Sequence, residues 1–481
     1  MRAFVLFLLI ITTCAYAQAP QKFYARYGGN GYDVGYDVRQ TLDKGYIITG
    51  STSSYGLGNT DMYLLKLDSM GHHRFQNTFG NANNDIGKAV IQLIDSSYVM
   101  VGYTNSIGFG GYDIFLVKAD KLGQLVWQKT IGGADWDFAN SLQQTTDGGF
   151  IIAGSTFSYG YGKEDAYVVK TDANGNTQWS KTFGGIEDDI FKSVVQTTDG
   201  GYVLCGSTKS YADINGDAWV FKLNNLGDSV WSKTYGGVKE DFFNSIKNLQ
   251  NNNLLVGGST KSTSVGGNFE TKFSVLNLID GIETHTYTDL SSVDEYYNDI
   301  EQGLNGYVVA CGLTKSLLYS DDGVVDIYST TYGYFNAYSI GGNTMDDLFA
   351  VCKTKDKGYA IVGRTTSYGA ILEDVFFIKT DSTGAYGNNI TSIKNINNDS
   401  FMLSVFPNPA TNTVFVKTNG VTKYNSLNCK IITVTGTELL NQKIYEETTP
   451  LNLENITNGM YYVIFYNGTN LLKTEKISII K

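Results

Sequence analysis

Short apolar runs alternate with Gly- and Asp-rich breaks along most of the chain. The clearest stretch lies between Gly132 and Gly184, where the breaks read TDGG, SYGYGKED and DANGN. The runs between them are FANSLQQT, FIIAGST, AYVVKTD and TQWSKTF. Apolar, β-branched and aromatic runs separated by turn residues are typical of consecutive antiparallel strands. The stretch therefore predicts a four-stranded sheet.

This unit repeats with a period of 52 residues. The opening glycines of the regular copies are Gly28, Gly80, Gly132, Gly184 and Gly236, and an Asp follows five positions after each. Each third run contains an acidic residue, and counting these residues gives seven units: Asp61, Asp113, Asp165, Asp217, Glu270, Asp326 and Asp374. The fifth and sixth units are degenerate, because residues 287–300 lack the usual GGxxxD opening.

Four-stranded repeats of this length are typical of a β-propeller, in which each sheet covers its neighbour. We predict an all-β chain with a seven-bladed propeller at 18–387. A β-solenoid is the alternative architecture. The GGxxxD connections and the SxSYG loops should share one face of the propeller, and the TDGG and DxNG turns should share the other.

The seventh unit lacks its fourth strand. Earlier units place an aromatic residue nine positions after the Lys of the third run, whereas nine positions after Lys379 stands Asn388. The missing pattern occurs at the start of the chain, in Phe23–Gly29. We predict that this segment closes the ring by pairing with Val375–Thr380.

The ends of the chain carry targeting patterns. Arg2, an apolar run at 4–11 and Ala15-Tyr16-Ala17 predict a signal peptide over 1–17, cleaved between Ala17 and Gln18. The run is too short to cross a membrane, and we expect no transmembrane segment. An Asn-rich linker is predicted at 388–400.

The last 80 residues contain the motifs LSVFPNPATNTVFVK, VTGTELL, NGMYYVIFYNG and a terminal KISIIK. Their order resembles the type A (Por) C-terminal sorting domain of the bacterial type IX secretion system. The resemblance implies a Gram-negative source, export across both membranes, and a secreted or outer-membrane, cell-surface location. It implies a small Ig-like β-sandwich at 401–481, with the translocon and sortase machinery as partners. The sorting-signal residues implied are Pro407, Asn408, Pro409, Gly459, Tyr461 and Lys481.

The charge limits the kinds of partner that we expect, and the cysteine content limits the disulfides. The formal charge is −11, and the region 18–400 has 28 basic against 42 acidic residues without a basic cluster. We therefore expect no nucleic-acid partner. The cysteines after the signal peptide are Cys205, Cys311, Cys352 and Cys429, and their spacing predicts buried thiols without a disulfide framework.

The repeated acidic columns favour a structural role, because a unique site needs one copy and Asp beside a turn glycine accepts backbone N–H bonds. We assign no catalytic, cofactor or metal residue. Calcium is the one cation considered, at ADINGD (212–217) and YSDDGVVD (319–326), and neither segment has EF-hand spacing.

Two regions are candidates for a ligand face. Tyrosines recur in the SxSYG loops at Tyr55, Tyr159, Tyr211 and Tyr368, either to contact a ligand or to wedge between blades. Blades five and six break the symmetry, with Asp321 and Asp322 nearby.

We predict a secreted or cell-surface, non-catalytic binding or scaffolding protein with a carbohydrate or protein ligand. One alternative is a hydrolase or lyase acting on polysaccharide through carboxylates of blades five and six, such as Glu270 or Asp322. Another is a purely structural surface component.

Overall fold

The computed structural model describes residues 22–481 apart from 213, 251, 265, 290, 316–319, 388–402, 408, 419–426, 434–436, 445, 447 and 468–469. Every regular element in the described part is a β-strand. The chain divides into two compact units, Met1–Ile393 and Lys394–Lys481. Among the described residues, no helix is long and apolar enough to cross a membrane. The predicted cleavage site and the linker at 388–400 lie outside the described residues.

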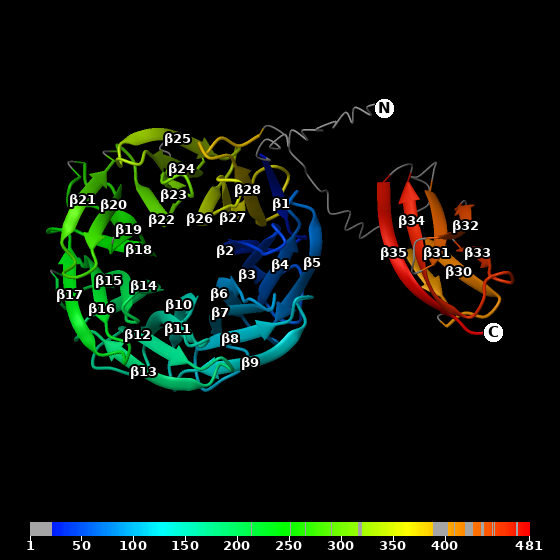
Figure 1. Cartoon of the computed structure of the whole chain (residues 1–481), viewed down its shortest axis with the longest axis horizontal. Helices are drawn as coiled ribbons and strands as arrows, with labels where there is room; N and C mark the ends of the chain where they lie inside the picture. Colours follow the sequence, from blue (N-terminus) through cyan, green and yellow to red (C-terminus); the bar gives the residue numbers. More distant parts are fainter. Residues whose placement is uncertain are drawn as a thin grey trace, which may run out of the picture. The chain divides into compact units, whose positions relative to one another are not determined.

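The first unit is a ring of seven antiparallel four-stranded blades (Figure 1). Blade 1 is β2 (Asp33–Gln40), β3 (Tyr46–Thr52), β4 (Asp61–Leu67) and β5 (His73–Phe79). Blade 2 is β6 (Asp85–Gln92), β7 (Tyr98–Thr104), β8 (Asp113–Ala119) and β9 (Leu125–Ile131). Blade 3 is β10 (Asp137–Gln144), β11 (Phe150–Thr156), β12 (Asp165–Thr171) and β13 (Thr177–Phe183). Blade 4 is β14 (Asp189–Gln196), β15 (Tyr202–Thr208), β16 (Asp217–Leu223) and β17 (Ser229–Tyr235).

The remaining blades follow the same order, and the predicted seven-bladed propeller is confirmed. Blade 5 is β18 (Asp241–Asn248), β19 (Asn253–Thr260), β20 (Glu270–Asn277) and β21 (Glu283–Thr288). Blade 6 is β22 (Glu295–Gln302), β23 (Val308–Thr314), β24 (Asp322–Tyr328) and β25 (Tyr334–Ile340). Blade 7 is β26 (Asp346–Lys353), β27 (Tyr359–Thr365), β28 (Asp374–Thr380) and β1 (Phe23–Tyr27).

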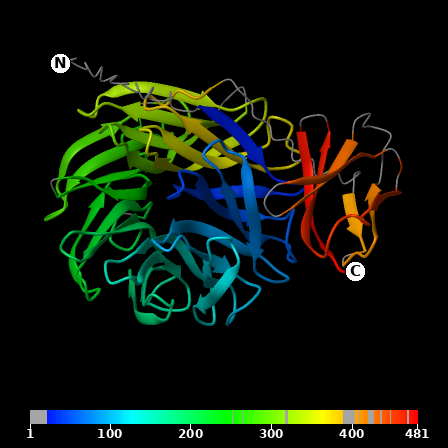
Figure 2. The same cartoon turned by 45° about the vertical axis from the view of Figure 1, so that its right-hand side comes forward.

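The N-terminal strand closes the ring as predicted. In Figures 1 and 2, β1, in dark blue, lies beside β28, in yellow. The two strands pair antiparallel from Phe23 opposite Lys379 to Tyr27 opposite Val375. An ion pair joins Arg26 to Asp374 across this seam. The first strand of the chain and the three strands of the seventh repeat therefore share one sheet.

The core lies between adjacent blades. The strands β3 and β11 are buried along their whole length, because both faces of the sheet are covered by neighbouring blades. One core cluster joins Val99, Val101 and Leu116 of blade 2 to Phe150 and Ile152 of blade 3. Each blade therefore depends on the next for burial of its apolar faces.

The two kinds of loop on the GGxxxD face bind each other. Ser53 N donates to Tyr32 O at 2.8 Å, and Asp85 N donates to Thr60 O at 2.7 Å. These bonds link the second-to-third loop of one blade to the connection between blades, so the predicted sharing of one face is confirmed.

The predicted series of acidic residues, one in the third strand of each blade, needs one correction. In each blade a Thr at the end of the second strand pairs with the first residue of the third strand, as in Thr156 opposite Asp165. In blade 6 the partner of Thr314 is Asp322, so Asp322 and not Asp326 continues this column. Asp326 lies four residues further along β24, opposite Ala310, where the regular blades have an apolar or aromatic residue.

The second unit consists of two antiparallel sheets. One contains β29 (Leu403–Phe406), β30 (Thr413–Thr418) and β33 (Thr448–Asn452). The other contains β31 (Leu427–Thr433), β32 (Glu438–Lys443), β34 (Gly459–Asn467) and β35 (Asn470–Ile479). Residues from both sheets, such as Val414, Leu451, Ile431 and Val463, form one buried cluster, as in a β-sandwich.

Candidate functional site

The first-strand Asp of a regular blade is held by the blade itself. Asp137 accepts hydrogen bonds from Thr156 Oγ1, from Ser158 Oγ at 2.7 Å and from Gly133 N at 2.8 Å. Asp33 and Asp189 have the same three kinds of donor. These carboxylates fix the start of the inner strand and leave little capacity for a ligand.

The repeat glycine is required by a close approach of two carboxylates. A Cβ atom at Gly132 would lie 2.1 Å from Asp113 Oδ1 and 2.7 Å from Asp137 Oδ2. The first of these carboxylates belongs to blade 2 and the second to blade 3. Any side chain here would therefore push the two blades apart.

The SxSYG tyrosines clamp the same glycine. Each hydroxyl donates to a repeat-glycine carbonyl, at 3.0 Å from Tyr55 to Gly28, 2.8 Å from Tyr159 to Gly132, 2.6 Å from Tyr211 to Gly184 and 2.6 Å from Tyr368 to Gly341. The rings of Tyr159 and Tyr211 remain 45% and 56% exposed, whereas Tyr55 and Tyr368 are less exposed. The four tyrosines lie on different blades, so they do not form one cluster.

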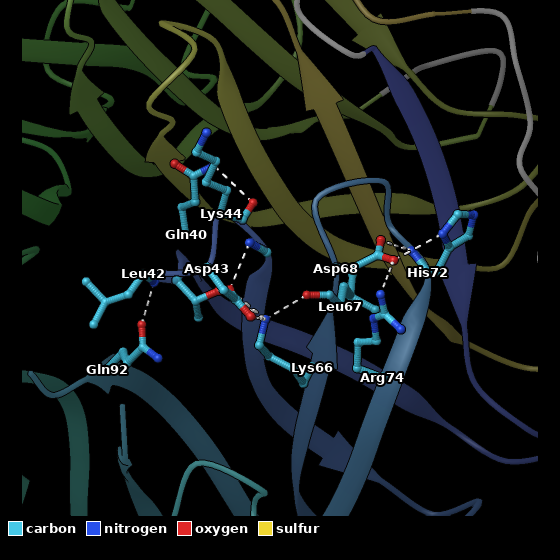
Figure 3. Close-up of polar contacts among 12 residues, drawn as sticks. Gln40, Leu42, Asp43, Lys44, Lys66, Leu67, Asp68, His72, Arg74 and Gln92 are labelled. Carbon is cyan, nitrogen blue, oxygen red and sulfur yellow. Dashed lines mark hydrogen bonds and ion pairs between the residues drawn. The ribbon is translucent and has the colours of Figure 1, made fainter. Parts of the chain in front are cut away.

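The opposite face is held together by a buried lysine (Figure 3). Lys66 Nζ donates to Leu67 O at 2.9 Å and to Thr41 Oγ1 at 3.0 Å, and it forms an ion pair with Asp43 of the turn. Equivalent pairs join the third-strand Lys to the turn Asp in four other blades: Lys118 with Asp95, Lys170 with Asp147, Lys222 with Asp199 and Lys379 with Asp356. Turns with this internal bonding are structural.

Blades 5 and 6 lack this lysine and carry polar groups elsewhere. Val275 and Ile327 occupy its position, and Asp326 replaces a core residue. Asp326 is 3% exposed and accepts a hydrogen bond of 2.5 Å from the Tyr297 hydroxyl, which also lies 2.5 Å from the Tyr328 hydroxyl. A carboxyl group in an apolar strand therefore anchors a short polar chain in the core.

A pocket of about 560 Å³ opens at this irregular junction. We call it the blade 5–6 pocket, and its chemically distinctive lining residues are Asp289, Glu295, Lys315, Asp322, Asp326, Tyr334 and Tyr338. Its size is in the ordinary range for small-molecule sites. Asp322 is held loosely there, by Ser320 Oγ at 3.5 Å and Ser339 Oγ at 3.3 Å.

The pocket carboxylates perturb one another. Burial raises the pKa of Asp326 to about 7, the bond from Tyr297 opposes this rise, and the charges of Glu295 and Asp289 add to it. Burial also raises the pKa of Glu295, which accepts a hydrogen bond of 3.0 Å from Thr314 Oγ1. Perturbed acids in a cleft are typical of functional sites.

The predicted residues are divided between this pocket and the scaffold. Asp322 lines the pocket, and neighbouring Asp321 does not. The backbone carbonyl of Asp321 accepts a hydrogen bond from Asp346 N at 2.9 Å. Glu270 instead accepts a hydrogen bond of 2.7 Å from Thr263 Oγ1. Sequence reasoning missed Asp289, Glu295 and the pocket role of Asp326. The sequence signal that could have identified Asp326 was an acidic residue within an otherwise apolar run.

The calcium segments are described only in part, since Asp213 and Tyr319 lie outside the described residues. Within the described ranges, no group of three or more His, Cys, Asp or Glu side chains is placed to hold a metal ion. The described cysteines, Cys205, Cys311, Cys352 and Cys429, are buried and free.

The motif residues of the second unit lie near the ends of its strands, some of them exposed and some buried. Pro407 and Pro409 are exposed, while Asn408 lies outside the described residues. Tyr461 is buried and its hydroxyl donates to Thr457 O at 2.9 Å. Lys481 Nζ donates to Leu453 O at 2.8 Å, which ties the terminal residue to the sandwich. Gly459 begins β34.

Comparisons with solved structures match the propeller at low identity. PorZ, a surface component of the type-IX secretion system of Porphyromonas gingivalis, is 11% identical with a TM-score of 0.42, over 95% of this chain and 60% of that one. The Neurospora crassa Pan2 WD40 domain is 8% identical with a TM-score of 0.47, over 75% and 97%. The β-propeller domain of a Pyrococcus furiosus protease is 10% identical with a TM-score of 0.42, over 76% and 99%. At these values the likeness carries no information on function.

One curated relative is the regulatory protein FlaEY of Caulobacter vibrioides, 23% identical over 294 residues, or 53% of this chain. The chain spans 30% of that relative's length. Residues 404–481 match the model of the secretion system C-terminal sorting domain. The chain therefore carries a type IX sorting domain behind a β-propeller, and it is an exported protein that is secreted or attached to the cell surface.

Proposed function

We propose that this exported propeller is a non-catalytic binding protein that recognises a carbohydrate in the blade 5–6 pocket. The observation that carries the proposal is the contrast between the regular blades and this junction. In the regular blades the repeated Asp and Tyr side chains are engaged by their own loops. At blade 6 the repeat fails, and four carboxylates and two tyrosines line a pocket. A pocket at regular blades 3 and 4 holds one carboxylate, Asp165.

The lining suits a polyhydroxylated ligand. The carboxyl oxygens of Asp322 and Glu295 can accept hydrogen bonds from sugar hydroxyl groups. The Tyr334 side chain is 52% exposed and offers an aromatic face to the apolar side of a sugar ring. Acidic residues outnumber the one lysine in the lining even when Asp326 holds its proton, so uronic or sulfated sugars would be disfavoured. The expected ligand is a neutral or amino sugar.

The test is a glycan array probed with the mature protein, followed by calorimetry on any glycan retained. Asp322→Asn and Tyr334→Ala should each weaken binding roughly tenfold or more, the scale for losing a central contact. Tyr211→Ala is the matched control, because Tyr211 is equally exposed but belongs to a regular loop. Equal weakening by the control, or no retained glycan, would contradict the proposal.

A hydrolase acting on polysaccharide is the second candidate, and the raised pKa of Asp326, about 7, favours it. A carboxyl group that holds its proton near neutral pH has the property required of a general acid. Under this alternative, the retained glycan is cleaved, and Asp326→Asn abolishes cleavage while binding persists. Binding without any product, in the unmodified protein, supports the non-catalytic proposal.

A further inference from the structure

Five aromatic side chains form a cluster where blades 2 and 3 meet, on the face that carries the GGxxxD connections. Ring centres lie 6.0 Å apart for Trp136 and Phe157, 6.2 Å for Trp136 and Tyr112, and 4.9 Å for Tyr103 and Phe138. Trp136 is 49% exposed and Phe157 is 38% exposed, so the cluster presents aromatic surface to solvent. We call these five residues the blade 2–3 aromatic cluster.

The backbone of the junction does not require aromatic side chains. Phe157 N donates to Trp136 O at 2.7 Å, and at the junction of blades 3 and 4 the equivalent bond joins Lys209 N to Asp188 O at 2.9 Å. There the two side chains form an ion pair of 3.0 Å. Blades 2 and 3 therefore place an exposed aromatic pair where the next junction has a charged pair. Exposed apolar surface that the fold does not need is typical of a binding surface.

The indole of Trp136 is held in place by close packing. A Cβ atom at Gly111 would lie 1.9 Å from Trp136 Cδ1 and 2.4 Å from its Nε1, so only a glycine leaves room for the ring. The equivalent residue of the next blade is Lys163. The Tyr112 ring also contacts the indole, at an interplanar angle of 79°. The exposed part of the ring is therefore presented in a fixed orientation, which lowers the entropy cost of binding.

The junction of blades 5 and 6 shows what aromatic rings at these positions bind. Phe269 precedes the third strand of blade 5, Tyr296 is the second residue of β22, and their ring centres lie 4.9 Å apart. Lys261 Nζ lies 3.8 Å from the Phe269 ring centre, and Lys315 Nζ lies 5.8 Å from that of Tyr296. The chain therefore covers these two rings with its own ammonium groups, as in cation–π contacts.

The blade 2–3 aromatic cluster has the rings of that junction without its lysines. Tyr112 and Phe138 occupy the two ring positions, whereas Asn105 and Phe157 occupy the two lysine positions. The region 18–400 has 28 basic against 42 acidic residues, so the field of the propeller attracts a cation. The rings and the charge both favour a cationic group that comes from another molecule.

We propose that the blade 2–3 aromatic cluster binds a cationic side chain, arginine or lysine, of a partner protein. The cation would lie against the exposed faces of Trp136 and Phe157, because Trp gives the strongest cation–π attraction and a flat guanidinium stacks on it. Trp, Tyr and Arg are also the side chains that dominate the energetics of protein–protein interfaces. This surface is separate from the blade 5–6 pocket, so it does not depend on the proposed function.

The test uses a fluorescently labelled peptide, GRGKG, and a neutral counterpart with citrulline and acetyl-lysine in place of Arg and Lys. The two peptides have nearly the same shape, and they differ in charge. Each is titrated with the mature protein at constant ionic strength, and binding is read as fluorescence anisotropy. The cationic peptide should bind roughly three- to tenfold more tightly than the neutral one, the scale of one cation–π contact.

The main variant is the double substitution Trp136→Asp with Phe157→Lys, which gives this junction the pair of blades 3 and 4. It keeps the net charge of the protein and the backbone bond of the junction, so it should fold and should bind both peptides equally. If it fails to fold, Trp136→Asn replaces it, because Asn84 occupies this position at the preceding junction.

Tyr161→Ala is the matched control, because it removes an aromatic ring that is 94% exposed in the loop that begins at Phe157. This variant should keep the preference for the cationic peptide. A preference that survives in the double variant, or that is lost in the control, would overturn the proposal. Equal binding of the two peptides by the unmodified protein, or binding of neither, would overturn it as well.

Discussion

At the scale of single residues, the same side-chain types have different roles depending on whether the repeat is intact. Asp137 is surrounded by hydroxyl and N–H donors from its own blade. Asp326 accepts a hydrogen bond from the Tyr297 hydroxyl and is buried among apolar strands. Burial in the second arrangement disfavours the ionised carboxylate and raises the pKa of Asp326. Residue type alone therefore does not separate structural acids from acids of a site.

The burial of Asp326 predicts a pH dependence of stability. Its folded-state pKa, about 7, is above the unfolded value of 3.8, so the folded state binds the additional proton between these pH values. Stability should fall as pH rises from about 4 to 7. Asp326→Asn keeps an acceptor for Tyr297 and should remove this decline, with a gain on the order of 4 kcal/mol at pH 7.5. Urea unfolding across this pH range measures the effect.

Asp199→Asn is the control with the opposite sign. Hydrogen bonds from Lys222, Thr197 and Gly201 outweigh desolvation and lower the pKa of Asp199 to about 2. Its contribution to stability is therefore present above pH 3.8 and is lost as pH falls toward 2. The two variants should differ from the unmodified protein in separate pH windows. A slope between pH 4 and 7 that Asp326→Asn leaves unchanged would contradict the assigned environment of Asp326.

At the scale of elements, the sequence predicted most of the strands because their apolar runs are short, regular and separated by turn residues. It also predicted the partner of β1, since a missing strand at one end matched an extra strand at the other. The pairing of the first and second strands skips a residue in all seven blades, which is a β-bulge. This bulge in every inner strand was not predictable from the sequence, because an unpaired residue does not change the composition or spacing of a run.

Closure by β1 predicts the effect of a truncation. Without residues 18–29, β28 becomes an exposed edge, and the buried side chains Phe23, Ala25 and Tyr27 are lost from the seam. Unfolding should remain cooperative but shift to a lower temperature, by roughly 5 °C or more, because several buried side chains are removed. Differential scanning calorimetry measures the shift.

Adding the missing strand in trans separates closure from general damage. A synthetic peptide of residues 22–29 should restore part of the lost Tm when added to the truncated protein, because it can pair with β28. A scrambled peptide of the same composition serves as the control. A truncated protein whose Tm equals that of the full chain would contradict a structural role for the seam.

At the scale of the whole molecule, the architecture and the location were predictable from the sequence, and the site was not. The difference lies in whether a feature is a continuous pattern along the chain. The propeller period and the terminal motifs are linear patterns, and the match at 404–481 bears out the second of them. The blade 5–6 pocket combines Asp289, Glu295, Asp322 and Asp326, which come from three separate segments. The folding of blade 6 and its flanking connections brings these segments together, so no local pattern marks the pocket.

The central claim is that the irregular blade 5–6 pocket holds the ligand. A crystal structure of the mature protein with a glycan retained on the array tests it most directly. The account predicts glycan density in the blade 5–6 pocket, with a sugar ring against Tyr334 and hydroxyl groups on Asp322. Density over the loops of Tyr159 and Tyr211, with the pocket holding only water, would contradict it.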